Sequence, residues 1–254
     1  HCIHATQGVL FFLYLSNLKY FGFGAFHKID LSPIRDYVEL SDFGIGGYNI
    51  PLKPIEGYKH LTSFGFGDKI RDTKIISTFC NLENLGISSQ NLKGLDFVFA
   101  LEKLKSISFS FGGTTAFEDL TQLKKLEELD IWRTKKLEIE HLIPINGIKN
   151  LKVLKLRELP RITNLSWLNN LSIETLVLED LRGLENFDSL NCQSLKTLVI
   201  KDARLEGAKL ESLGQFENIQ NIQIYKWYLD NKSKDIASFL NRANITEIEL
   251  KYLL

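Results

Sequence analysis

Leu151-Lys-Val-Leu154-Lys-Leu156 is the stretch that decides the fold, because its pattern Leu-x-x-Leu-x-Leu recurs along the whole chain. Ile or Phe sometimes replaces Leu. Further copies are Leu82-Glu-Asn-Leu85-Gly-Ile87, Leu104-Lys-Ser-Ile107-Ser-Phe109, Leu126-Glu-Glu-Leu129-Asp-Ile131, Leu195-Lys-Thr-Leu198-Val-Ile200, Ile219-Gln-Asn-Ile222-Gln-Ile224 and Ile245-Thr-Glu-Ile248-Glu-Leu250. One unit of this size cannot bury its apolar side alone, so neighbouring units must stack into a continuous core.

The spacing of the copies identifies the kind of repeat. Their first apolar residues are Leu18, Leu40, Leu61, Leu82, Leu104, Leu126, Leu151, Ile173, Leu195, Ile219 and Ile245. Successive differences between these numbers run from 21 to 26 residues. Helical repeats of the ankyrin and tetratricopeptide kind are longer, at about 33–34 residues, and would not keep the Leu-x-Leu alternation.

With these eleven matches the chain resembles the leucine-rich repeat superfamily, in particular the short bacterial repeats of the internalin type. The resemblance runs from Leu18 to the end. It implies an α/β fold: a curved solenoid of about eleven repeats with a parallel sheet on its concave face. We expect one domain over 1–254, with an N-terminal turn at 1–17, repeats at 18–226, and a C-terminal cap at 227–254 that holds a helix at 234–242 and a last strand at 245–250.

The chain departs from the family pattern after each strand, where the usual Asn is missing. The corresponding positions are Gln90, Gly112, Thr134, Leu159, Leu181, Ala203 and Trp227. Main chain or water must then satisfy the turn backbone, because buried unpaired amides are costly. On the outer side of the repeats, the apolar spacing of 115–125 suggests a short helix, and Asn169, Asp188 and Ser233 are candidate caps of similar segments.

Alternation along each strand predicts which residues face outward. Leu154 and Leu156 must face the core together, so that Val153, Lys155 and Arg157 point to the open face. In the first half of the chain the outward positions are mostly glycine: Gly22, Gly24, Gly44, Gly46, Gly65, Gly67 and Gly86. Two interpretations stay open. The glycines relieve crowding where the sheet bends, or a segment of a partner or of this chain lies directly against the sheet.

In the second half the outward positions become aromatic and charged, and Trp, Tyr and Arg are the residue types enriched in interface hot spots. This composition favours a protein-binding patch over scattered solvated charge. The predicted partner-binding residues are Trp132, Arg133, Lys155, Arg157, Glu179, Lys201, Tyr225 and Lys226.

Bulk composition argues against several other classes of protein. Lys and Arg together number 31, as do Asp and Glu, so no overall field attracts nucleic acid or an anionic membrane. Cys2, Cys80 and Cys192 are too few and too scattered for a disulfide framework, and we expect inert buried thiols in a reducing cytosol. Phosphate-binding loops, nucleophile elbows and zinc motifs are missing from the sequence, which predicts no catalytic residues, no metal site and no cofactor.

The predicted function is therefore non-catalytic recognition of another protein through the concave face, in the bacterial cytoplasm, as an inhibitor, an immunity-type protein or an adaptor. Two alternatives stay open: a secreted or surface adhesin-like or effector-like repeat protein, and a regulatory fragment of a larger enzyme. We expect no nucleic-acid and no membrane partner. The exposed sheet edges would allow a weak homodimer.

Overall fold

The computed structural model describes residues 18–25, 30–47, 50–67, 72–89, 92, 94–184, 187–201, 218–226 and 247–252. The chain forms two compact units, His1–Leu126 and Glu127–Leu254, which we call unit 1 and unit 2 and treat separately. The N-terminal turn at 1–17, the cap helix at 234–242 and candidate cap Ser233 lie outside the described residues. The expectation of a single domain stays a prediction.

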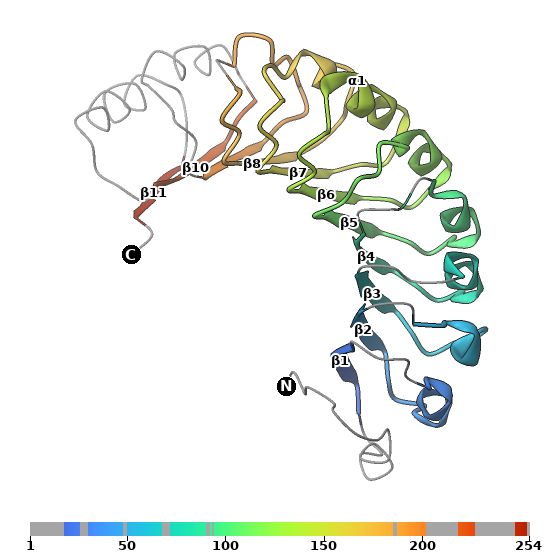
Figure 1. The fold of residues 1–254 in the computed structure, drawn as a ribbon. Coiled ribbons are helices and arrows are strands. Elements are labelled where there is room, and N and C mark those ends of the chain that lie inside the picture. Colours follow the sequence, from blue (N-terminus) through green and yellow to red (C-terminus); the bar gives the residue numbers. More distant parts are fainter. Residues whose placement is uncertain are drawn as a thin grey trace. The chain divides into compact units, whose positions relative to one another are not determined.

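Unit 1 contains five parallel strands among its described residues, one from each repeat (Figure 1). They are β1 Tyr20–Ala25, β2 Asp42–Gly47, β3 Ser63–Gly67, β4 Asn84–Ser88 and β5 Ser106–Ser110. Each strand pairs with the next along the chain, and the register places equivalent repeat positions side by side, as in Gly44 beside Gly65. The strands line the inner side of the curve within the unit (Figure 1).

Unit 2 repeats this arrangement with six described strands. They are β6 Glu128–Trp132, β7 Val153–Arg157, β8 Thr175–Glu179, β9 Thr197–Lys201, β10 Asn221–Lys226 and β11 Glu247–Tyr252. These strands are also parallel and follow chain order. The last strand, Glu247–Tyr252, overlaps the predicted 245–250, whose first two residues lie outside the described part. Together the two units confirm the predicted α/β repeat solenoid.

Burial alternates along the strands as the sequence predicts. In β7, Leu154 and Leu156 are fully buried, whereas Lys155 and Arg157 are half-buried on the open face. Burying a Leu side chain stabilises the fold by about 1.5–3 kcal/mol, so a stripe of two core residues per strand supplies most of the driving force. Val199 is an exception, because it occupies an outward position of β9 and is only 9% exposed.

The outer side of each unit is built from short 3₁₀ helices. These are Ser32–Asp36, Lys53–Ile55, Thr73–Thr78, Asp96–Ala100, Phe117–Gln122, Ile143–Gly147 and Ser166–Leu168, with one α-helix among the described residues, α1 Ile139–Leu142. The predicted helix at 115–125 is thus a 3₁₀ turn. Asn169 is the C-cap of the 3₁₀ helix Ser166–Leu168, where its amide donates to the Ser166 carbonyl, and its Oδ1 accepts a hydrogen bond from the Asn191 amide. Asp188 lies next to no helix among the described residues. With so few residues per repeat, the chain cannot complete a longer helix.

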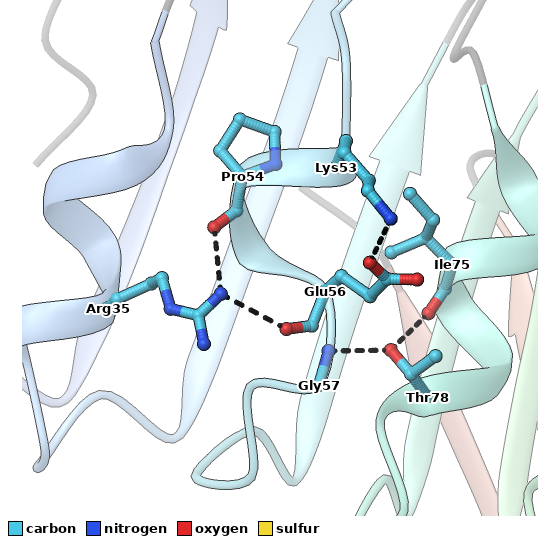
Figure 2. Close-up of polar contacts among 7 residues, drawn as sticks. All are labelled: Arg35, Lys53, Pro54, Glu56, Gly57, Ile75 and Thr78. Carbon is cyan, nitrogen blue, oxygen red and sulfur yellow. Dashed lines mark hydrogen bonds and ion pairs between the residues drawn. The ribbon is translucent and has the colours of Figure 1, made fainter.

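Polar contacts join neighbouring repeats on the outer side of unit 1 (Figure 2). The Arg35 guanidinium donates to the carbonyl oxygens of Pro54 at 3.4 Å and of Glu56 at 3.3 Å. One repeat further on, the Gly57 amide donates to Thr78 Oγ1 at 2.8 Å. These bonds satisfy carbonyl and amide groups at 3₁₀-helix ends, which have no partner within the short helix itself.

In unit 2, main-chain hydrogen bonds hold the turns that follow the strands, where the usual Asn is missing. Arg133, Glu158 and Asp180 each follow a strand and adopt left-handed backbone conformations, with φ of 54°, 50° and 47°. Their amides donate to the carbonyl of the last residue of the next strand, at 3.0, 2.7 and 2.9 Å respectively. Main chain therefore satisfies these turns, as expected from the sequence.

The glycines of unit 1 are not required by crowding within the sheet. An added Cβ at Gly46 or Gly65 would meet no atom within 4 Å, and at Gly86 it would meet the nearest atom at an ordinary 3.5 Å. The crowding interpretation is therefore not supported by the contacts of these strands. The glycines instead leave an unusually bare strip of backbone along the open face.

Replacing Gly65 by Ala should stabilise the protein by about 0.5–1 kcal/mol, because Ala restricts the unfolded chain and fits the strand without a clash. Urea unfolding followed by far-UV circular dichroism would measure the change. Gly57→Ala is the matched control: Gly57 also has open space around it but adopts a φ of +71°, so Ala should destabilise there. A loss of stability in Gly65→Ala would contradict the open space found around an added Cβ at this position.

The two described cysteines differ in exposure. Cys192 is buried, with its Sγ 3.3 Å from the Leu171 carbonyl oxygen, as predicted. Cys80 is exposed, so the prediction of a buried thiol is wrong at this position. Phe79 and Leu82 on either side are fully buried, and the turn between them carries Cys80 to the surface.

Candidate functional site

The candidate site is the open face of unit 2, defined as the outward side chains of β6 to β10. Its first row is set by strand register and contains Trp132, Arg157, Glu179, Lys201 and Tyr225, one from each successive strand. A second row beside it contains Asp130, Lys155, Val177, Val199 and Gln223. Six of the eight predicted residues therefore lie together on this face; Arg133 directly follows β6, and the Lys226 side chain lies outside the described part.

Trp132 is held in place by charged neighbours at one end of the first row. Its indole Nε1 donates to Glu158 Oε1 at 2.9 Å, and Arg133 Nε donates to the other oxygen of the same carboxylate. The guanidinium carbons of Arg157 and Arg133 lie 5.1 and 5.4 Å from the Trp132 ring centroid, within cation–π range. The ring is half-buried and fixed, which lowers the entropy that a partner must remove on binding.

The cations of β7 pair with carboxylates of β6. Arg157 forms a bidentate pair with Asp130, with N–O distances of 2.9 and 2.5 Å. Lys155 Nζ lies 2.6 Å from Glu128 Oε1. The eight predicted partner-binding residues include neither Glu128 nor Asp130. Repeat position does place Asp130 on the open face, because it shares a row with Lys155, one strand from Arg157.

A fourth charged pair lies beyond the end of β8. Arg182 donates to Asp180 Oδ1 at 2.9 Å, and this bond together with the charge of Asp180 raises the pKa of the Arg182 guanidinium.

Left-handed backbone at a residue other than glycine costs about 1–3 kcal/mol and recurs at functional sites. Such a residue follows each of β6, β7 and β8.

The pKa of the Glu158 carboxyl lies below its usual 4.5. Burial raises it, but hydrogen bonds from Arg133 and Trp132 and the charges of Arg133 and Arg182 together outweigh burial. Ionised Glu158 therefore stabilises the folded state. Because the folded-state pKa is depressed, this contribution is fully present above pH 4.5 and is lost as the pH falls through the folded-state value.

Glu158→Gln should consequently be less stable than the parent at neutral pH, and the difference should shrink below pH 4.5. Urea midpoints at neutral pH and at about pH 3.5 would measure this change. Glu102→Gln, an exposed position in unit 1, is the control for loss of one carboxylate. A difference between Glu158→Gln and parent that is independent of pH would show that Glu158 acts through packing alone.

The opposite end of the first row carries Lys201 and Tyr225. The Lys201 ammonium lies 5.4 Å from the Tyr225 ring centroid, and the Tyr225 hydroxyl donates to Gln223 Oε1 at 3.2 Å. Between the two aromatic ends, Glu179 pairs in strand register with Arg157 on one side and Lys201 on the other. The face thus presents aromatic rings at both ends and charges between them.

No group of three His, Cys, Asp or Glu side chains in the described part of the chain could hold a metal ion. His141 has a structural contact instead, since its Nδ1 accepts a hydrogen bond from the Glu138 amide at 3.1 Å and caps α1. Among the described helices, none has both the length and the apolar character needed to cross a membrane.

Comparison with known proteins gives structural neighbours only. No protein-family model and no curated protein sequence matches the chain. An internalin (InlF) from Listeria monocytogenes is similar with a TM-score of 0.50 and 18% identity, over 100% of this chain and 85% of that one. The functional domain of InlJ from the same species has a TM-score of 0.50 and 19% identity, over 85% of this chain and 52% of that one. The chain therefore has the leucine-rich repeat fold seen in bacterial internalins.

Proposed function

We propose that the protein is a non-catalytic recognition module that binds another protein through the open face of unit 2. The observation that carries the proposal is the single row in which strand register places Trp132, Arg157, Glu179, Lys201 and Tyr225. Leucine-rich repeat folds are typically protein-binding scaffolds. Trp, Tyr and Arg are also the side chains that most often dominate binding energy at protein interfaces.

The balance of charge on this face supports a protein rather than a nucleic acid as the partner. Among the described side chains, five cations and five carboxylates lie on or directly beside it: Arg133, Lys155, Arg157, Arg182 and Lys201, with Glu128, Asp130, Glu158, Glu179 and Asp180. Nucleic-acid binding depends on neutralising several phosphates with unpaired Lys and Arg. Here most cations already engage a carboxylate, so their charge is not available to a phosphate.

We further propose that the protein acts in the bacterial cytoplasm as an inhibitor or immunity-type protein. The free, exposed thiol of Cys80 supports a reducing compartment, where such thiols persist. A gene for a toxin or enzyme next to the gene for this protein would support the inhibitor role. The homodimer expected from the sheet edges remains a prediction, which analytical ultracentrifugation over a range of concentrations would test.

Affinity capture from the lysate of the source organism tests the binding face. The immobilised protein is compared with the variant Trp132→Ala/Arg157→Ala/Tyr225→Ala, after circular dichroism has shown that the variant is folded. The matched control, Phe99→Ala/Ile143→Ala/Lys149→Ala, removes exposed apolar and cationic side chains away from the open strand face. We expect the first variant to lose its partner and the control to keep it. Equal recovery by all three proteins would exclude this face.

A further inference from the structure

Glu179 and Lys201 differ from the other charged side chains on the open face of unit 2. The four charges of β6 and β7 form two ion pairs, Asp130 with Arg157 and Glu128 with Lys155. In the described part of the chain, neither Glu179 nor Lys201 takes part in an ion pair, although they are register partners on β8 and β9. The carboxylate of Glu179 and the ammonium of Lys201 are therefore neighbours that could each still form an ion pair with a group of another molecule.

Neither of the two cations next to Glu179 in register pairs with its carboxylate. Arg157, on β7, makes its bidentate contact with Asp130 on the far side from Glu179. Lys201, on β9, lies against the Tyr225 ring of β10. Glu179 is half-buried and so has lost part of its hydration, and no described residue supplies it with an ionic partner. A partially desolvated carboxylate gains more from a new charge-assisted hydrogen bond than a fully solvated one does.

On both strands, a threonine and a valine come before this pair and face the same side of the sheet. Val177 and Val199 are register partners, as are Thr175 and Thr197. Val199 is only 9% exposed, and Val177 beside it is half-buried. A side chain that reached Glu179 would lay its methylene groups over these valines, because long cationic side chains cover apolar surface while their heads make polar contacts.

We propose that the strip formed by Thr175, Val177, Glu179, Thr197, Val199 and Lys201 accepts a protein segment that places an Arg or Lys on Glu179 and a carboxylate on Lys201. This proposal deepens the proposed function and rests on it. Arg suits Glu179 best, since its guanidinium matches a carboxylate bidentately. The ammonium of Lys201 repels a second cation at the neighbouring position, so the strip also selects the order of the two charges.

Selection from a phage-displayed library of short random peptides tests the proposal without knowledge of the natural partner. The immobilised parent should enrich peptides that carry Arg or Lys close to Asp or Glu. These peptides should bind Glu179→Gln roughly tenfold more weakly or worse, as expected for loss of one close charge pair. The exchanged variant Glu179→Lys/Lys201→Glu should instead prefer peptides with the two charges interchanged.

The control variant Glu102→Lys/Lys149→Glu makes the same charge changes at exposed positions outside the open face and should bind the parent's peptides unchanged. Circular dichroism and urea unfolding would show that each variant is folded. Failure to enrich any peptide, or an identical peptide set for the parent and the exchanged variant, would overturn the strip's assignment. Lysate capture that still depends on Trp132 and Tyr225 would then leave the proposed function standing.

Discussion

Replacing Phe64 by Ala is expected to lower the free energy of unfolding by about 3–5 kcal/mol, the largest effect of any substitution considered. Phe64 is 1% exposed and lies on the core face of β3. Its ring centroid is 5.8 Å from that of Phe43 and 5.4 Å from that of Phe79, which it meets edge-on. Truncation removes these contacts, together with that to Phe66 at 6.0 Å, and leaves a cavity between two repeats, which the stacked strands cannot close by collapsing.

Phe99→Ala is the matched control, because Phe99 is 50% exposed and its truncation creates no cavity. Urea unfolding by far-UV circular dichroism measures both variants. Because each repeat of a solenoid contacts only its neighbours, amide hydrogen exchange should accelerate first in β2 to β4 of Phe64→Ala. If the two substitutions lowered the free energy of unfolding equally, the buried aromatic cluster would contribute no more to stability than an exposed Phe side chain does.

Replacing Gly183 by Ala is expected to destabilise the protein by about 3 kcal/mol, although only one methyl group is added. A Cβ at this position would lie 2.4 Å from the carbonyl oxygen of Pro160 and 3.1 Å from that of Ile162. Both contacts are with backbone, so no side-chain rotation relieves them. The turn after β8 has to move away from the turn after β7, which disturbs the main-chain bonds between them.

The same substitution at Gly65 provides the comparison, because Ala fits there and is expected to stabilise. The two Gly→Ala changes should therefore differ in sign. Urea midpoints measured under one set of conditions would establish the difference. If Gly183→Ala left the stability unchanged, the turns after β7 and β8 would have to lie further apart than the 2.4 Å contact between an added Cβ and the Pro160 carbonyl oxygen implies.

The repeat pattern predicted the strands well because burial on one face of a strand requires alternate apolar residues. Leu154 and Leu156 show the rule clearly: both are fully buried, and the lysine between them faces outward. The outer segments were predicted less well. Hydrophobic spacing indicates a helix but does not distinguish α from 3₁₀ geometry over so few residues, and Phe117–Gln122 is a 3₁₀ helix.

The candidate site was likewise predicted only in part. Alternation and repeat spacing together placed Trp132, Arg157 and Lys201 on one open face. They did not show that Arg157 takes Asp130 as its partner, or that the Trp132 indole is fixed by Glu158. Ion pairing between repeats depends on side-chain rotamers and on the backbone conformation at Glu158. The φ of 50° at this residue does not follow from the local amino-acid pattern.

The amino-acid sequence was enough to establish the repeat, the buried stripe and the chemical character of the open face, because all three follow from the period and from the two-residue alternation of a strand. Tertiary structure alone decided which charges of that face pair with one another and which, Glu179 and Lys201, have no ion-pair partner among the described residues. It also showed that Gly183 is sterically required whereas Gly65 is not. These properties depend on distances between residues some twenty positions apart, which only the stacking of successive repeats defines.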